Sequence, residues 1–491
     1  MHYHISYAQP ESKFITLRFT ITNIQDDSIC LQLPSWRPGR YELQNFAKNI
    51  RGFFITDSAG NAVSYKKTSK DRWQVNTKGL HSIFIQYEYY ANQLDAGGSY
   101  VSAEFLYINP VNCMMYVEGR MHEPYIVEFD LPMDYTLATQ LHKQNKHCYT
   151  APDFDYLADS PLIASSSLQS VAFTDSFKGK EYSIHLWFQG RHTVDLERLK
   201  NDTRQYVSYQ ITCMDDMPCD TYHFMYLMLD TAYRHGVEHL NSTVIALGKY
   251  TDQTEEEFYN DLLAISSHEF FHLWNVKRLR PADMWPYDYK RENYSELGYV
   301  YEGVTTYLGD LFLVQSGVWS AEQYINSLRS DLLRHYTNDG RFRYSLAESS
   351  WDTWLDGYVP GVPGRKISIY IEGLIAAWVA DVVLFTSTAG KKRLSDALQQ
   401  LYKSTYLCGK GYTAFDYIRI LEELSDSSFT PYTAELINGR GYFDAWLTTL
   451  CEQLGLEISF TEENKSLKIS TKENTTSTQQ QNLDTWLGPI L

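Results

Sequence analysis

The stretch HEFFH at residues 268–272 matches the pattern H-E-x-x-H. On an α-helix, residues four apart project from one face, so His268 and His272 can hold a single metal ion between them. Glu269 follows the first histidine directly, and its carboxylate therefore flanks the metal without binding it. From there it can take a proton from the water that the metal activates. The stretch predicts a zinc peptidase with one Zn²⁺ per chain.

This chemistry requires a helix, and the flanking sequence predicts one. The stretch TEEE at residues 254–257 is typical of a capping box with acidic residues in the first turn. Phe258, Leu262 and Ile265 continue at helical spacing toward the histidines. Pro281 is expected to end the helix, because proline cannot continue it.

A third ligand is expected on a second helix. Residues 300–315 carry apolar side chains at helical spacing, with Glu302 on the flank opposite Val304. By itself such a glutamate is more often only a partner of the helix dipole. Beside the upstream motif, it completes a set of His268, His272 and Glu302 plus water, which is typical of open catalytic zinc sites. Candidates for orienting the imidazoles from the outer shell are Thr305, Thr306 and Asp310.

A second motif competes for the metal. HGVEH at residues 235–239 matches the inverted pattern H-x-x-E-H, which also requires a helix. The aromatic and aliphatic run at 222–229 and the sequence VIAL at 244–247 instead favour strands on both sides. We therefore expect Glu238 to lie on a strand beside the cleft. There are two alternatives: this motif binds a metal, or Glu238 is only a surface carboxylate at the end of a strand.

Further stretches carry a family resemblance. They are LWNVKRLRP at 273–281, YEGVTTY at 301–307, PSWRPGRY at 34–41 and DSP at 159–161. In these stretches, over about residues 1–455, the chain resembles the glycyl aminopeptidase family of zinc metallopeptidases, which is related to the thermolysin-like and aminopeptidase N groups. Members commonly carry a PDZ domain after the peptidase domain, and too few residues remain here for one.

The resemblance also implies roles outside the metal set. The family has a G-G-x-E-H segment at 235–239, and related aminopeptidases use its glutamate, here Glu238, to hold the free α-amine of the substrate. Gly236 is retained, whereas His235 replaces the first glycine and is expected to narrow the adjoining pocket. Tyr370 resembles a catalytic tyrosine in a Y-x-K-G segment, whose hydroxyl supports the oxyanion. The departure there is Glu372 in place of lysine.

Composition narrows the function classes. The net charge of −17 over 491 residues argues against partners such as nucleic acid or an anionic membrane. The start of the chain lacks a basic segment followed by an apolar one, and no run of 18 apolar residues appears, so neither a signal peptide nor a transmembrane helix is expected. The cysteines form no C-x-x-C pair and are odd in number, which favours reduced core thiols in a cytoplasmic protein.

Periodicity predicts an α+β multidomain chain. Short alternating β-rich runs over residues 1–165 predict an N-terminal β-sandwich-like domain. The peptidase domain is expected at 166–455, with a sheet lobe at 166–250 and a helical lobe at 251–455. The resemblance implies that this domain is thermolysin-like. Residues 456–491 are expected to form a short C-terminal segment whose polar stretch 471–481 is a loose tail. Gly357 to Gly364 has the composition of a loop.

The favoured function is a zinc-dependent aminopeptidase that removes Gly or Ala from peptides with a free N-terminus. A zinc endopeptidase, in which Glu238 binds no amine, is one alternative. Another is a catalytically silent peptide-binding protein on a peptidase scaffold, although such a binder would not need the general base Glu269. The sequence leaves open the preferred side chain, the physiological peptide, the oligomeric state and the contacts of three basic residues. Those residues, Lys277, Arg278 and Arg280, would bind a substrate carboxylate or form internal ion pairs.

Overall fold

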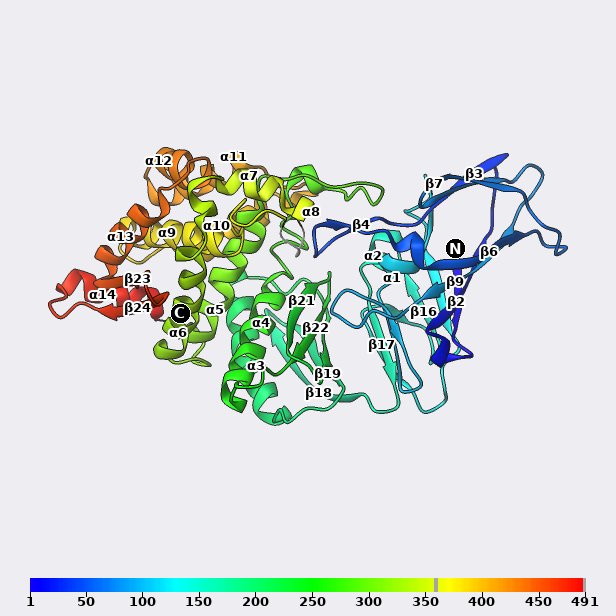
Figure 1. Cartoon of the computed structure of the whole chain (residues 1–491), viewed down its shortest axis with the longest axis horizontal. Coiled ribbons are helices and arrows are strands. Elements are labelled where there is room, and N and C mark those ends of the chain that lie inside the picture. The colour runs from blue at the N-terminus through cyan, green and yellow to red at the C-terminus, as the bar shows by residue number, and fades with distance from the viewer. Residues whose placement is uncertain (357–360, 489–491) are drawn as a thin grey trace.

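The structure, a computed structural model, describes residues 1–356 and 361–488. The first residues of the predicted loop at 357–364 therefore lie outside the described part of the chain. A β-rich N-terminal region is followed by a region with a five-stranded sheet, many helices and a C-terminal hairpin (Figure 1). The predicted α+β class is confirmed.

The N-terminal region consists of several sheets that enclose an apolar core. The largest runs in the order β15 (His142–Lys143), β16 (Cys148–Ala151), β13 (Tyr125–Phe129), β1 (His2–Ser6), β2 (Phe14–Ile21), β9 (Ile83–Tyr90) and β6 (Ile50–Thr56). Smaller sheets are formed by β10 (Tyr100–Val101), β11 (Phe105–Ile108), β17 (Leu162–Ser165) and β14 (Thr136–Thr139), and by β12 (Tyr116–Val117), β3 (Ser28–Gln32), β8 (Arg72–Asn76) and β7 (Tyr65–Ser69). Along β2 and β9 every second side chain is buried, as expected where one face of a sheet covers a core. Two short helices, α1 (Pro110–Cys113) and α2 (Phe154–Ala158), complete the region.

The sheet that borders the site runs in the order β18 (Gln169–Phe177), β19 (Lys180–Gln189), β20 (Thr221–Met228), β22 (Ser242–Gly248) and β21 (Tyr233–Glu238). Strand β21 is antiparallel to β22 and forms the edge. The sequence predicted a sheet lobe at 166–250, and the expectation of strands there is wrong for α3 (Leu196–Met214). The buried apolar side chains of that helix lie mostly in its second half, and they are Leu199, Tyr206, Val207, Tyr209, Ile211 and Met214.

Helix α4 (Glu255–Phe271) carries the H-E-x-x-H pattern, and its predicted capping box is confirmed. The expectation that it runs to Pro281 is wrong, because the helix ends at Phe271. The chain turns immediately afterwards, where the backbone N–H of Lys277 donates to the carbonyl of His272 at 3.1 Å. Pro281 therefore lies beyond a helix end that local backbone hydrogen bonds already define.

Two glycines allow close approach of the helices around the candidate site. Glu302 lies in a π-helical turn, Tyr299–Val304, that leads into α5 (Thr305–Gln315). A Cβ on Gly303 would lie 2.3 Å from the Cα of Gly373, in α9 (Ile371–Ser387), and one on Gly309 would lie 3.0 Å from the Cα of His268. Side chains at these positions would separate the helices that bring His268, Glu302 and Tyr370 into one site.

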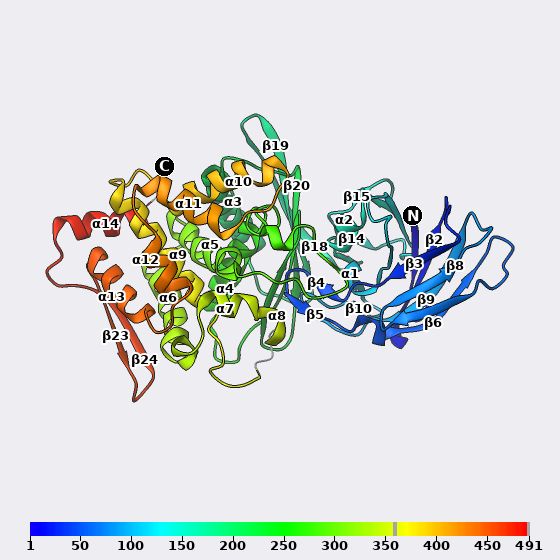
Figure 2. The same ribbon diagram turned by 90° about the horizontal axis from the view of Figure 1, so that it is seen from above.

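The remaining helices complete the helical part of the chain (Figure 2). They are α6 (Ala321–Tyr336), α7 (Leu346–Trp351), α8 (Thr353–Asp356), α10 (Leu394–Ser404), α11 (Ala414–Ser425), α12 (Thr430–Tyr432) and α13 (Phe443–Leu454). None of the helices in the described residues has both the length and the apolar character that a membrane span requires. All seven cysteines are free, and the expectation that they are core thiols is wrong for Cys408, which is exposed.

The C-terminal segment is not the loose tail that its polar composition predicted. A hairpin of β23 (Leu456–Thr461) and β24 (Ser466–Thr471) leads to α14 (Ser477–Leu487). Trp486 is fully buried and stacks on Trp378 with ring centroids 4.8 Å apart. A single large aromatic residue, together with a capping box at Thr476, holds a helix that is otherwise polar.

Candidate active site

The two histidines of α4 and the glutamate of the π-helical turn meet at one point. The Nε2 atoms of His268 and His272 are 3.0 Å apart. Glu302 Oε2 lies 3.4 Å from each of them. Donor atoms of a tetrahedral zinc ion with bonds of about 2.0–2.2 Å stand about 3.3–3.6 Å apart, so this triangle has nearly the size that the ion requires.

The surroundings of the triangle favour a cation at its centre. Glu302 Oε2 is buried and accepts no hydrogen bond among the described residues. Burial alone would raise the pKa of Glu302, but the neighbouring imidazoles outweigh it and lower the pKa to about 2. Burial alone would lower the pKa of His272, but the carboxylates of Glu302 and Glu238 raise it to about 10. Buried carboxylates that favour a positive charge beside them fit a divalent metal.

A backbone carbonyl orients the second histidine. His272 Nδ1 lies 2.6 Å from the carbonyl oxygen of Asn275, which places the Nδ1 proton there and leaves Nε2 to face the triangle. The Thr305 hydroxyl donates to the same carbonyl at 3.1 Å. Of the other candidates for the outer shell, Thr306 donates to the carbonyl of Glu302, and Asp310 accepts from Ser327. The sequence did not single out Asn275, because a backbone carbonyl leaves no residue-type signal.

Glu269 lies against the edge strand. Its Oε2 accepts a hydrogen bond from the Thr243 hydroxyl at 3.2 Å. A Cβ on Gly236 would lie 2.0 Å from Glu269 Oε1, so only glycine fits at that position of β21. Burial raises the pKa of Glu269 to about 8, and the carboxylates of Glu238 and Glu302 act in the same direction. A carboxylate with a raised pKa accepts protons more readily than an ordinary one.

Glu238 lies on the same face of β21 as Gly236, because side chains two apart on a strand share a face. Its side chain is buried, and its Oε1 accepts a hydrogen bond from the Tyr41 hydroxyl at 3.1 Å. Tyr41 belongs to the N-terminal region. The predicted strand at 235–239 is confirmed, and the inverted zinc motif therefore lacks the helix it needs.

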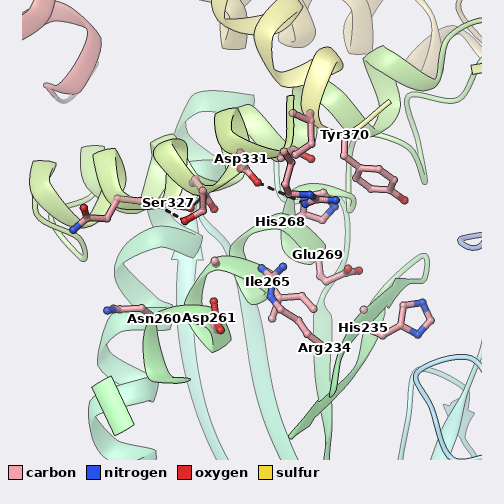
Figure 3. Close-up of a pocket in the computed structure, with 18 of the residues that line it drawn as sticks. Arg234, His235, Asn260, Asp261, Ile265, His268, Glu269, Ser327, Asp331 and Tyr370 are labelled. Atoms are coloured by element: carbon pink, nitrogen blue, oxygen red, sulfur yellow. Dashed lines mark hydrogen bonds and ion pairs between the residues drawn. The ribbon is translucent and has the colours of Figure 1, made fainter. Parts of the chain in front are cut away.

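His235 has a different environment from Gly236 and Glu238. Figure 3 shows Arg234 and His235 leaving β21 on opposite sides. His235 still lines the cavity, and burial together with the charge of Arg40 lowers its pKa to about 3, so the ring is neutral. Strand alternation thus places the residue that replaces the family's glycine on the face of β21 opposite to Glu238.

The basic residues after the second histidine are internal. Lys277 Nζ lies 2.9 Å from Asp159 Oδ1, and the same oxygen is 3.0 Å from His239 Nδ1. The Arg278 guanidinium donates to the carbonyls of Leu240 and Leu273. Arg280 lies over the ring of Tyr287 at 3.9 Å. The interpretation as internal pairing is confirmed for Lys277, and it also accounts for the DSP stretch that contains Asp159.

Tyr370 lies at the start of α9, beside the metal triangle, the name used here for the donor atoms of His268, His272 and Glu302 (Figure 3). Its ring is stacked on His268 with centroids 6.3 Å apart. Glu372, which replaces the family's lysine, points away into the protein: its Oε1 lies 2.9 Å from His335 Nδ1, and its Oε2 accepts from the backbone N–H of Ser368 at 2.8 Å. The substitution therefore fixes the first turn of α9, which carries Tyr370.

His335 makes the contribution of its contact with Glu372 to the stability of the fold depend on pH. We call this contact, which holds the first turn of α9, the anchor of α9. Its Nε2 also lies 3.0 Å from Asp444 Oδ1. Burial alone would lower the pKa of His335, but the hydrogen bonds with Asp444 and Glu372 outweigh it and raise the pKa. A histidine with a raised pKa stabilises the fold fully below its unfolded value of about 6.5, and the contribution is lost as pH rises through the folded pKa.

We therefore expect His335→Gln to lower the free energy of unfolding by about 3 kcal/mol at pH 6, because it leaves the Glu372 carboxylate buried without its cation. The deficit should shrink above the folded pKa. Denaturant unfolding of both proteins at several pH values measures it, and a deficit that does not vary with pH would contradict the assignment.

These groups line one open cavity of about 940 Å³ between β21 and helices α4, α5 and α6. The metal triangle, Glu269, Glu238 and Tyr370 all face it. Its outer part is polar and is lined by residues that include Asp261, Asp310, Ser327 and Asp331. An extended peptide fits a cavity of this size and position, because β21 has a free edge beside it.

Two family models match the chain. The model of the Peptidase M61 N-terminal domain matches residues 2–166, and that of M61 glycyl aminopeptidase matches residues 261–376. The chain belongs to the M61 glycyl aminopeptidase family. The first match includes Tyr41, and the second includes the metal triangle and Tyr370. This M61 protein is a metallopeptidase.

Solved structures extend the comparison of this M61 chain. An aminopeptidase N family protein from Idiomarina loihiensis is 25% identical, with a TM-score of 0.87 over 94% of this chain and 79% of that one. A Glu-to-Ala mutant of an M1 zinc metallopeptidase from Deinococcus radiodurans, bound to a Tyr-Ser-Ala substrate, is 14% identical, with a TM-score of 0.54 over 90% of this chain and 94% of that one. Aminopeptidase A from Legionella pneumophila, in complex with aspartic acid, is 13% identical, with a TM-score of 0.52 over 96% of this chain and 52% of that one. No curated protein matches the chain.

Proposed function

We propose that this peptidase is a zinc-dependent aminopeptidase that removes Gly or Ala from the free N-terminus of peptides. The observation that carries the proposal is the buried carboxylate of Glu238, which faces the cavity on the same strand face as Gly236. A buried carboxylate beside a hydrolytic centre is costly unless a cation reaches it, and the α-ammonium of a peptide is such a cation.

His268, His272 and Glu302 would hold one zinc ion. When bound, zinc acts as a Lewis acid on the scissile carbonyl and makes a water nucleophilic near neutral pH. Glu269, whose carboxylate lines the cavity together with these three residues, receives the proton of the attacking water and returns it to the departing amine. The Tyr370 hydroxyl donates a hydrogen bond to the oxyanion that develops on the carbonyl oxygen.

The edge strand and Glu238 fix the register of the substrate. Peptide backbone pairs with the free edge of β21, and Glu238 holds the ammonium, so the first peptide bond lies at the metal. The rings of Tyr41 and Tyr301, with centroids 4.8 Å apart, fill space beside Glu238. This filling supports a preference for a small first side chain. His235 would narrow the pocket for the first side chain only from the opposite face of β21.

Blocked substrates test the exopeptidase assignment. We expect N-acetylated peptides to be poor substrates, because acetylation removes the charge and leaves Glu238 buried without a partner. Glu238→Ala should raise KM and lower kcat for free peptides together, since a misplaced amine also displaces the scissile carbonyl. Steady-state kinetics on paired free and acetylated Gly-Ala and Ala-Ala peptides measure both effects.

Glu238→Gln is the matched variant, since it keeps the side-chain volume and removes the charge. Equal cleavage of blocked and free peptides, unchanged in both variants, would establish the endopeptidase alternative instead. Absence of any hydrolysis by the zinc-loaded protein would instead support the alternative of a catalytically silent peptide-binding protein.

A further inference from the structure

A hairpin of the N-terminal region enters the candidate active site. Strands β4 (Trp36–Arg37) and β5 (Glu42–Leu43) lie between the N-terminal sheets and the peptidase region in both ribbon views (Figures 1 and 2). The turn that joins them carries Gly39 and Tyr41. The backbone N–H groups of Ser35 and Trp36, just before the turn, donate to the carbonyl of Tyr289 at 2.8 and 3.1 Å, which ties the hairpin to the peptidase region.

Tyr41 contacts one oxygen of Glu238. Its hydroxyl donates to Oε1 at 3.1 Å, and the tyrosine itself is only 2% exposed. Its ring packs against Tyr301, the residue directly before the candidate ligand Glu302. Burial raises the pKa of Tyr41 well above its ordinary value, and the charge of Glu238 adds to this. The hydroxyl therefore stays protonated and acts as a donor to the carboxylate.

Gly39 lies close to the other carboxylate oxygen of Glu238, Oε2. A Cβ at Gly39 would lie 3.0 Å from Glu238 Oε2 and 2.7 Å from Val237 Cγ1. The backbone of the turn follows a left-handed course that few residues other than glycine adopt, with φ of +81° at Gly39 and +49° at Tyr41. A tyrosine in that conformation costs free energy, and a turn that keeps it is held there by its surroundings.

We propose that Tyr41 is a positioning residue for amine recognition, contributed to the active site by the N-terminal region. The proposal rests on the aminopeptidase function, because it assigns to Tyr41 the orientation of the carboxylate that binds the ammonium. The hydrogen bond to Oε1 fixes the rotation of the carboxylate, and the lone pairs that remain are then directed at the substrate amine. Substrate selection in this enzyme thus depends on a residue far outside the metal-binding helices.

The first test removes a single hydroxyl. In Tyr41→Phe we expect KM for a free Gly-Ala peptide to rise about 10-fold, the order of effect of deleting one hydrogen bond to a charged group. The residual hydrolysis of the acetylated peptide should stay at the wild-type rate, because that substrate does not use Glu238. The ratio of free to blocked cleavage should therefore fall about 10-fold, while zinc content stays unchanged.

Two further variants separate positioning from folding. Gly39→Ala presses on the other oxygen of Glu238 and should lower the same ratio. Tyr87→Phe deletes another buried hydroxyl of the N-terminal region, one that donates to the carbonyl of Cys113 at 2.6 Å, and should leave the ratio unchanged. Thermal unfolding of each variant records any general loss of structure.

The outcomes are distinct for the two proposals. A wild-type enzyme that shows no preference for free amines removes the aminopeptidase function itself, whatever Tyr41 does. A wild-type preference that survives intact in folded, zinc-loaded Tyr41→Phe overturns the role of Tyr41 alone. An equal fall of the ratio in Tyr87→Phe also overturns it, since the effect would then be structural.

Discussion

Glu269→Gln is expected to retain zinc and lose between about 10²- and 10⁴-fold in kcat, the range that general-base catalysis supplies. The amide keeps the shape of the side chain but cannot accept the proton of the attacking water. Its hydrogen bond with the Thr243 hydroxyl can persist, so the cavity should keep its form. Steady-state kinetics with the best free peptide, alongside zinc analysis of the same sample, measure the loss.

Thr243→Val is the informative companion to that variant. It removes the hydroxyl that holds Glu269 Oε2 and preserves the base, so the loss in kcat should be far smaller. Near-normal turnover by Glu269→Gln would show that another group of the cavity activates the water.

His272→Ala should abolish stoichiometric zinc and, with it, peptide hydrolysis. Removing one of the three proposed protein ligands breaks a set whose donor atoms lie 3.0 to 3.4 Å apart, and the two that remain hold the ion far more weakly. We expect elemental analysis to find about one zinc per wild-type chain and a small fraction of that in the variant. Glu302→Gln should also bind zinc weakly, because the charge that attracts the ion is lost.

His335→Ala is a suitable control for histidine loss. It removes a histidine that lies between carboxylates yet belongs to the anchor of α9 rather than to the metal triangle, so its zinc content should match the wild type. Wild-type zinc content in His272→Ala would exclude the proposed ligand set.

The parts of the site that sequence predicted are those with a local pattern. The spacing of His268 and His272, together with the capping box before them, specified both a helix and its chemistry, and α4 has that form. The aromatic and aliphatic run at 222–229 and the sequence VIAL at 244–247 likewise predicted strands, and β20, β21 and β22 have that form. The boundaries were harder: α4 ends at Phe271 because of hydrogen bonds made by the backbone, to which residue identity gives little clue.

The parts of the structure that the sequence did not predict have three different causes. Tyr41 lies 197 residues from Glu238, and no spacing rule connects them. Asn275 acts through its carbonyl oxygen. The helix α14 was missed because its polar composition outweighed two available signals, the capping box at Thr476 and the lone Trp486. Trp486, like Tyr41, acts through a tertiary contact, its stacking on Trp378.

The contacts of Asp159 extend the set of substitutions that can inactivate this enzyme. This one carboxylate, in the stretch that follows α2, contacts both Lys277, five residues beyond a candidate ligand, and His239, the neighbour of Glu238, for which amine binding is proposed. A natural variant with every metal-binding and proton-transfer residue intact could therefore still be inactive through a single change at this aspartate. Surveys that judge family members by the H-E-x-x-H helix alone would count such a variant as a working enzyme.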